Sequence, residues 1–362
     1  MQIRDYTLTE IRPPPSSATG KRFVNSLSFL CRCQTYWNSG SRLKSSLSYY
    51  WQVLTVLISN EENCFHRLGT FFGGCVSVKK AALNQVANAL AGSGTAFASD
   101  SDPELIKQAV PFSLKLMESV VAENPRHSGL LTALCSGFTQ YGYAFVQEEA
   151  DEIESRDYTR ADAQRVRARK LFLRARGYGL AGLELAHDGF TRALAANPRG
   201  AVRVAKKNDV PLLYWTAAAW GAAISLGKND PALLAEIPEM EALIDRALEL
   251  DETWDEGSLH EFLITYEMTR QGTAGDAAER AAFHFDRARE LSHGFRASVY
   301  VAYAEAVCVE KQQSVKFEQL LQQALAIDPD AHPVLRLSNL VMQQRARWLL
   351  GRKSDLFLNP SG

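Results

Sequence analysis

The sequence predicts an all-α fold, in which degenerate helical hairpins stack into a compact solenoid-like array. From about residue 81 onward, apolar residues recur with a helical period and are interrupted by Pro and Gly. No alternating run of β-branched residues reaches the length of a strand. Small and large residues also recur at the fixed offsets typical of paired helices.

Composition supports a globular domain and excludes several classes of protein. The chain has 362 residues, of which 46% are hydrophobic and 22% charged, so it can bury a substantial core. A mean hydropathy of -0.18 and the absence of a long uncharged apolar span argue against a protein with many membrane spans. Residues 1–75 carry eight of the 40 Lys and Arg and four of the 41 Asp and Glu, so the remainder has a net charge of -5. This acidic body predicts no binding of nucleic acid.

The first 75 residues differ in character from the rest. Residues 13–15 are all proline, and no period of 2 or 3.6 is sustained. We predict that residues 1–74 form a leader outside the fold, which is disordered, a defective signal peptide, or the product of a misplaced translation start. Phe72, Gly73 and Gly74 precede Cys75 as in a degraded lipobox, although the apolar run before them is short and interrupted. Lipidation of Cys75 and an ordinary loop cysteine are both open at this point.

The remaining cysteines give no metal or disulfide signal. Cys31 and Cys33 are too close for the usual zinc-site spacing. Cys135 and Cys308 are expected as small buried side chains in helices. No metal ion and no cofactor is predicted.

Within the body, residues 75–99 are expected to form an anchor linker and a first helix, and residues 100–358 the repeat domain. The segment from Asp100 to Glu104 predicts a helix start, with Asp as the cap and Pro103 and Glu104 in the first turn. Asn or Asp followed by Pro, the same kind of helix boundary, recurs at residues 124–125, 229–231 and 328–329.

A tetratricopeptide-like repeat fits the body in degenerate form. Such a unit is a pair of helices that together span 34 residues. Its second helix carries a small residue, a large residue four positions later and another small residue three positions after that. Phe317, Leu321 and Ala324 fit that frame. The small residues of five such frames, at positions 120, 175, 247, 288 and 324, are separated by 55, 72, 41 and 36 residues, so only the last two spacings approach one unit. A match at residues 186–198 lies too close to its neighbour for a hairpin to fit.

No catalytic motif is found. His260 and Glu261 share a helix but lack the second His that a zinc protease requires, and a hydrogen-bonded His is the preferred interpretation. No phosphate loop, nucleophile elbow or dinucleotide fingerprint is present. The acidic run at 148–154 and the basic run at 160–176 are interpreted as solvated faces of a helix pair with complementary charge. The sequence therefore predicts a protein that is not an enzyme.

Aromatic residues are concentrated on a few helices, and they have two interpretations. Core packing is one; an apolar cavity or docking groove is the other, because Tyr and Trp carry a polar group that a purely apolar core does not need. The residues predicted to line a ligand or partner surface are Tyr141, Tyr143, Phe145, Trp215, Trp220, Glu261 and Tyr266.

Three blocks make the sequence recognisable: residues 136–151 (SGFTQYGYAFVQEEAD), 210–226 (VPLLYWTAAAWGAAISL) and 250–264 (LDETWDEGSLHEFLI). Together with residues 344–350 and 355–358, they closely resemble the TRAP transporter T-component family. The resemblance covers residues 75–358, approximately.

The resemblance implies a bacterial periplasmic lipoprotein of tetratricopeptide-like hairpins, with no enzymatic activity. It implies association with the solute-binding protein of a tripartite ATP-independent periplasmic transporter, assembly as a homo-oligomer of three copies, and binding or passage of an apolar small molecule. Cys75 lies where the family places its lipidated residue, so the membrane is reached only through a lipid anchor. Residues 1–74 depart from the family because they lack a proper signal peptide.

Two other functions remain as alternatives. One is a tetratricopeptide-like scaffold lipoprotein that binds a protein partner in envelope assembly. The other is a hydrolase with an unrecognised site, for which His260 and Glu261 would be the first candidates.

Overall fold

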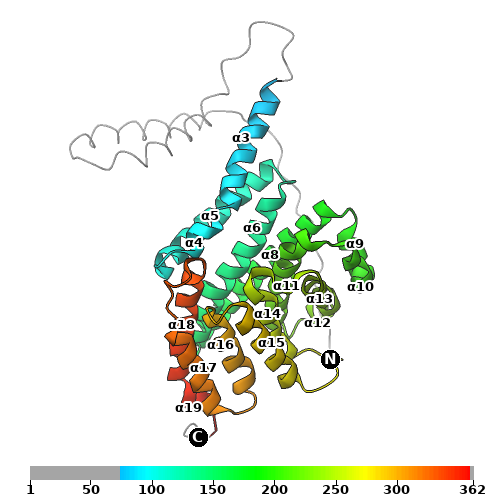
Figure 1. Ribbon diagram of the computed structural model, residues 1–362. Coiled ribbons are helices and arrows are strands. Elements are labelled where there is room, and N and C mark those ends of the chain that lie inside the picture. Colours follow the sequence, from blue (N-terminus) through cyan, green and yellow to red (C-terminus); the bar gives the residue numbers. More distant parts are fainter. Residues whose placement is uncertain (1–73, 359–362) are drawn as a thin grey trace, which may run out of the picture. The chain divides into compact units, whose positions relative to one another are not determined.

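The computed structural model describes the backbone of residues 74–358, and the side chains from Lys80 to Leu358. The leader predicted for residues 1–74 therefore lies outside the described residues, apart from Gly74, where the first described helix begins. Described residues form helices and no strand (Figure 1), so the predicted all-α class is confirmed. The finer tetratricopeptide-like arrangement stays a prediction.

The helices follow one another with short connections. In chain order they are α3 (Gly74–Ala91), α4 (Gly94–Ala98), α5 (Pro103–Glu123), α6 (Ser128–Tyr141), the π-helix η1 (Gly142–Gln147), α7 (Glu148–Ile153), α8 (Tyr158–Ala186), α9 (Phe190–Ala196), α10 (Pro198–Ala201), the short 3₁₀ turns η2 (Val202–Val204) and η3 (Lys207–Asp209), α11 (Val210–Ser225), α12 (Pro231–Leu234), α13 (Ile237–Asp251), η4 (Trp254–Gly257), α14 (Ser258–Glu267), α15 (Ala277–Leu291), α16 (Ala297–Tyr303), the π-helix η5 (Ala304–Cys308), α17 (Ser314–Ala326), η6 (Pro333–Leu335), α18 (Arg336–Gly351) and α19 (Lys353–Leu356).

The start of α5 shows why these boundaries fall where they do. The carboxylate of Asp102 accepts hydrogen bonds from the backbone N–H groups of Glu104 and Leu105, at 3.1 and 3.0 Å. These donors have no partner inside the helix, and Pro103 has no N–H to satisfy. The helix start predicted between Asp100 and Glu104 is therefore confirmed.

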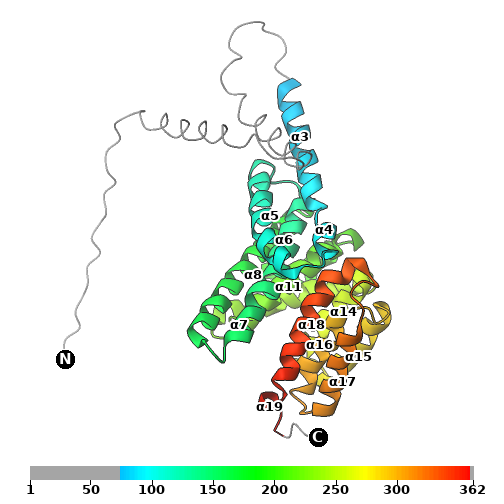
Figure 2. The same ribbon diagram turned by 90° about the vertical axis from the view of Figure 1, so that its left-hand side faces the viewer.

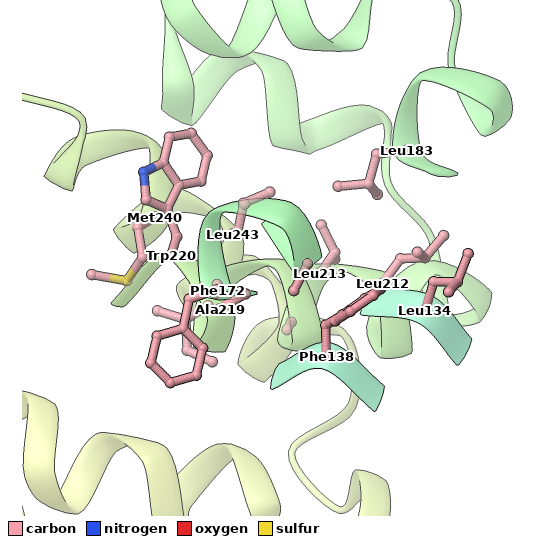
Figure 3. Packing of buried hydrophobic residues seen from close by; sticks show 14 of the residues in the cluster. Leu134, Phe138, Phe172, Leu183, Leu212, Leu213, Ala219, Trp220, Met240 and Leu243 are labelled. Carbon is pink, nitrogen blue, oxygen red and sulfur yellow. The ribbon is translucent and has the colours of Figure 1, made fainter. Parts of the chain in front are cut away.

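The described residues form two apolar cores, one in the half of the chain up to Leu263 and one in the half from Ile264 onward. In the first, α8 packs between α6 and α11, and α11 packs on α13; Figure 3 shows Phe138, Phe172, Leu213 and Trp220 in this cluster. The second core is formed by the helices from α14 to α18. Small residues such as Ala168 and Ala175 are fully buried where helices meet, as their repeat offsets predict. Bringing backbones close in this way increases the contact area that each helix pair can bury.

The two ends of the described segment are in contact with each other. Helix α18, near the C-terminus, lies beside α4 and α5 near the start of the described segment (Figure 2). Arg336 of α18 donates a hydrogen bond of 2.7 Å to the carbonyl oxygen of Ser99. The two halves are therefore joined by α18 as well as by the direct connection between α13 and α14.

The match at residues 186–198 does not form a hairpin. Helix α8 ends at Ala186, and the next helix, α9, has only seven residues. The prediction that no helical hairpin fits there is confirmed. No helix within residues 74–358 has the length and apolar character needed to cross a membrane.

Candidate functional site

A large cavity of about 1930 Å³ lies between the two halves. Its wall takes residues from α5, α6, η1, α11, α14, α16, η5 and α18, so both apolar cores contribute. Helix α11 supplies a face of small and aromatic residues, namely Trp215, Ala218, Gly221 and Ala222. Because small side chains leave room beside the large ones, this face forms a wall rather than a filled core.

Gly221 illustrates how the wall is shaped. A Cβ atom at this position would lie 3.2 Å from the ring of Phe262 on α14. The absent side chain therefore lets α14 and its ring approach α11 closely. Phe262 in turn stacks on Tyr266, with ring centroids 5.7 Å apart, and both rings line the cavity.

Six of the seven residues predicted from the sequence line this cavity: Tyr141, Tyr143, Phe145, Trp215, Glu261 and Tyr266. Trp220 is not among the lining residues. Its side chain is buried in the first core, its Nε1 donates to Glu236 at 2.9 Å, and the guanidinium of Arg176 lies 4.7 Å from its ring centroid. Because Trp220 and Trp215 are five residues apart on one helix, they point in different directions. A role for any of these residues in binding stays a prediction.

Two π-helical segments supply part of the wall. The segment η1 interrupts the continuous helix formed by α6 and α7, and η5 follows α16 directly. Each adds a wider turn, which changes the direction of the side chains that follow it, and such turns occur frequently at functional sites. Tyr143, Phe145 and Gln147 from η1 and Glu305 from η5 reach the cavity. Nothing in the hydrophobic period of the sequence marks these segments.

The first polar end of the cavity is formed around Arg345 of α18. Its Nη2 lies 3.1 Å from a carboxylate oxygen of Asp151 and 2.5 Å from one of Glu305. Arg165 holds the other oxygen of Asp151 at 3.0 Å. The Nη1 atom of Arg345 is buried and has no hydrogen-bond partner among the described residues. Only 6% of the Arg345 side chain is exposed, against 22% for Asp151 and 37% for Glu305.

Glu148 lies beside this end and is 5% exposed. Burial raises the pKa of its carboxyl to about 8, and the nearby carboxylates of Glu305, Glu152 and Asp151 act in the same direction, against Arg345. Among the described residues its Oε1 has no hydrogen-bond partner. The interpretation of the whole acidic run as a solvated face is therefore wrong at Glu148, which the helix turns inward. The complementary pairing is confirmed elsewhere, since Arg165 also holds Glu154 at 2.7 Å.

The second polar end is formed around Arg296, at the start of α16. Its Nη2 lies 3.0 Å from Asp255 and its Nη1 lies 3.8 Å from Glu261. Burial raises the pKa of Glu261, which Arg296 opposes. Burial likewise raises the pKa of Tyr214, with a further contribution from the Glu261 carboxylate.

His260 does not form part of either end. Its Nδ1 lies 2.8 Å from Nδ1 of His284 on α15, so one ring donates and the other accepts. The prediction that His260 is a hydrogen-bonded histidine is confirmed. Among the side chains from Lys80 to Leu358, no group of three or more His, Cys, Asp or Glu residues could hold a metal ion.

Sequence reasoning missed Arg345, Asp151, Glu305 and Arg296 as residues of the wall. Asp151 and Arg345 both stand in blocks that carry the family resemblance, which was the available signal. Their charge alone favoured a position in solvent.

The site is an apolar and aromatic cavity with two ends of paired charges. The family model for the TRAP transporter T-component matches residues 99–357. An uncharacterized protein of Treponema pallidum (strain Nichols) is 30% identical over 267 residues, which cover 73% of this chain and 83% of that protein. The chain belongs to the TRAP transporter T-component family, and the resemblance noted in the sequence is confirmed. This family is one of transporter components and not one of enzymes, so the chain is an accessory component of a TRAP transporter.

Proposed function

We propose that this protein is a periplasmic accessory component that associates with the solute-binding protein of its transporter and binds or passes an apolar ligand. The observation that carries the proposal is the cavity of about 1930 Å³, walled by aromatic and small residues of both halves. Its volume exceeds the range of about 300–1,000 Å³ usual for small-molecule sites, so it can take a long or bulky apolar molecule.

Association with the solute-binding protein is tested by affinity capture of the full chain from gently solubilised membranes. Recovery of a solute-binding protein in stoichiometric amount is the expected result. Repeated capture that recovers envelope proteins but no solute-binding protein favours the alternative, a scaffold for envelope assembly.

Ligand binding is tested separately, by mass spectrometry of organic extracts of the purified protein. We expect an apolar small molecule that is absent from extracts of a variant with a filled cavity. Ala218→Leu is suited to this purpose because Ala218 of α11 lies on the cavity wall, so that a larger side chain at this position takes up part of the cavity. A matched control is Gly177→Leu, which has no neighbouring atom within 4 Å of the added Cβ.

We further propose that the protein forms a homo-oligomer, which the family resemblance gives as a trimer. Leu105, Phe112 and Leu116 form an exposed apolar stripe on one face of α5, and Phe112 is 74% exposed. Apolar stripes of this kind are typical of interaction surfaces. Phe112→Asp should lower the mass measured by light scattering, whereas Val315→Asp, at another exposed apolar position, should not. Equal masses for both variants would exclude this stripe as the interface.

Attachment to the membrane through Cys75 is also a proposal. A diacylglyceryl-modified Cys75 as the first residue of the membrane-extracted protein is the expected finding in intact-mass and peptide analysis. An unmodified Cys75 inside a longer chain would contradict both the anchor and the cleavage.

A further inference from the structure

Arg345 of α18 lies on the cavity wall and has a hydrogen-bond donor without a partner. Its Nε donates to one carboxylate oxygen of Glu305 at 3.4 Å, and its Nη2 donates to the other oxygen and to Asp151. The third nitrogen, Nη1, is buried and has no partner among residues 80–358. Because a guanidinium stays protonated and offers only donors, Nη1 requires an acceptor.

The guanidinium is held firmly in place by its neighbours. The two carboxylates engage it from Nε and Nη2, and its Cζ atom lies 4.3 Å from the ring centroid of Trp348. Only 5% of Arg345 is exposed. The direction of the Nη1 donor is therefore fixed before a ligand enters, which lowers the entropy that binding would cost.

The ion pairs around Arg345 already balance its charge. Arg165 holds Asp151 and Glu154, so the network that these pairs form contains three carboxylates and two guanidinium groups. A ligand carboxylate would add a fourth negative charge to this partly buried network, and a ligand ammonium would compete with both arginines for the same oxygens. An uncharged oxygen accepts from Nη1 without adding a charge to be compensated.

Two further polar groups from η1 suit an uncharged oxygen at this end. Gln147 lines the cavity, and its Oε1 is buried without a partner in the described range, so it can accept from a ligand hydroxyl. Tyr143 also lines the cavity. Burial raises the pKa of the Tyr143 hydroxyl, which therefore stays a neutral donor, and the charges of Glu148, Glu305 and Arg345 also act on it.

We propose that Arg345, through Nη1, binds the uncharged oxygen of an amphipathic ligand, a hydroxyl or a carbonyl group, while the apolar body of the ligand occupies the rest of the cavity. This inference rests on the proposed binding of an apolar ligand and names its polar group. Gln147 and Tyr143 are the neighbouring groups that a hydroxyl or a carbonyl oxygen can engage in addition.

Four probes with the same number of chain carbons separate the polar group from the apolar body. They are hexyl methyl ketone, the corresponding alcohol, the analogue in which a methylene group replaces the oxygen, and octanoate. Binding of the three volatile probes to the full-length protein is measured by their depletion from the headspace in gas chromatography, and binding of octanoate by calorimetry. We expect the ketone and the alcohol to bind at least about tenfold more tightly than octanoate, whose charge would be buried.

The variant Arg345→Lys assigns this binding to Nη1. Lysine keeps the positive charge for Asp151 and Glu305 but lacks the second terminal nitrogen. Since a hydrogen bond to a charged group is worth about tenfold or more in affinity, the ketone and the alcohol should bind about tenfold more weakly. The methylene analogue should bind within about twofold of its affinity for the parent chain.

The matched control is Arg287→Lys. Arg287 is also held by two carboxylates, those of Glu252 and Glu290 at 2.5 and 2.7 Å, but it is not a residue of the cavity wall. This variant should bind all four probes as the parent chain does. Circular dichroism of both variants checks that the helices are retained.

A second measurement needs no variant. Isotope-edited infrared spectroscopy of the ketone, labelled with carbon-13 at its carbonyl, reports the hydrogen bond directly in the parent chain. The carbonyl stretching frequency of the bound ketone should be lower than in an alkane solvent. A bound ketone that absorbs as it does in alkane has no donor at its oxygen and overturns the inference, even where Arg345→Lys does not fold.

Failure of this inference differs from failure of the proposed function. If the methylene analogue binds but folded Arg345→Lys keeps the full affinity for the ketone and the alcohol, the assignment to Arg345 is wrong and the apolar cavity stands. Octanoate that binds as tightly as the ketone likewise overturns the choice of an uncharged oxygen. If none of the four probes binds, the proposed ligand binding fails together with this inference.

Discussion

Helices α6, α8 and α11 approach one another closely at Gly179, and adding one methyl group there should be destabilising. A Cβ atom at Gly179 of α8 would lie 2.1 Å from Oγ1 of Thr216 on α11 and 2.9 Å from Sγ of Cys135 on α6. Thr216 is fully buried, and its Oγ1 donates to the carbonyl oxygen of Leu212 at 2.6 Å. Relief of the clash therefore requires either a shift of a helix or the loss of this hydrogen bond.

The expected magnitude follows from two opposing effects. Alanine is favoured over glycine inside a helix by about 1 kcal/mol. Overpacking of a well-filled core costs about 1–3 kcal/mol. Gly177, two residues earlier on α8, has no atom within 4 Å of an added Cβ, so Gly177→Ala receives only the favourable effect. The free energy of unfolding of Gly179→Ala should therefore lie about 1–3 kcal/mol below that of Gly177→Ala.

The assay is urea-induced unfolding of both variants and of the parent chain, followed by far-ultraviolet circular dichroism. A double variant, Gly179→Ala with Thr216→Ala, should recover part of the loss because Oγ1 is removed. A Gly179→Ala chain as stable as Gly177→Ala would refute the argument that this glycine is required by the close approach of three helices.

Three further predictions concern stability. Burial, followed by the charge of His260, lowers the pKa of His284 to about 4, whereas a histidine in the unfolded chain binds a proton near pH 6.5. The free energy of unfolding should therefore fall by about 2 kcal/mol between pH 7 and pH 5, because the unfolded chain takes up the proton first. A pH profile of the melting temperature that His284→Asn leaves unchanged would contradict this. Asn339 is buried, and its Oδ1 accepts a hydrogen bond of 3.0 Å from the backbone N–H of Ala297. The free energy of unfolding of Asn339→Ala in urea should therefore be about 1–3 kcal/mol lower, and wild-type stability would be the opposing result. Asp102→Ala should lose about 1 kcal/mol through its missing cap, and Asp102→Ser should recover most of it in the same measurement.

The periodic part of the sequence contains most of the information about the helices and their buried faces. Phe317, Leu321 and Ala324 were placed on one face by their offsets, and all three are fully buried in α17. The same offsets also fit residues 186–198, which form no hairpin. Small residues followed by a large one recur in any buried helix, so the offsets are not specific for a hairpin. The sequence pattern therefore predicts which residues are buried in the cores, but it does not predict how the helical hairpins are arranged.

The cavity was only partly predictable. Aromatic residues with polar groups pointed to Tyr143, Trp215 and Tyr266, which do line it. Trp220 carries the same signal but satisfies its N–H inside the core, through Glu236. Arg345 could not be found by this reasoning, because a charged residue is expected in solvent unless its partners are known, and these partners come from positions about 40 and 194 residues away.

The contact of α18 with α4 and α5 has a consequence for how the chain unfolds. In an open array of repeats, each unit contacts only its neighbours, so the ends can unfold separately and stability is roughly a sum over units. Here the last long helix holds residues near the beginning of the described segment, through Arg336 and Ser99 among others. Loss of either terminal segment removes contacts from the other, so the two halves should unfold together in one cooperative transition rather than from one end to the other.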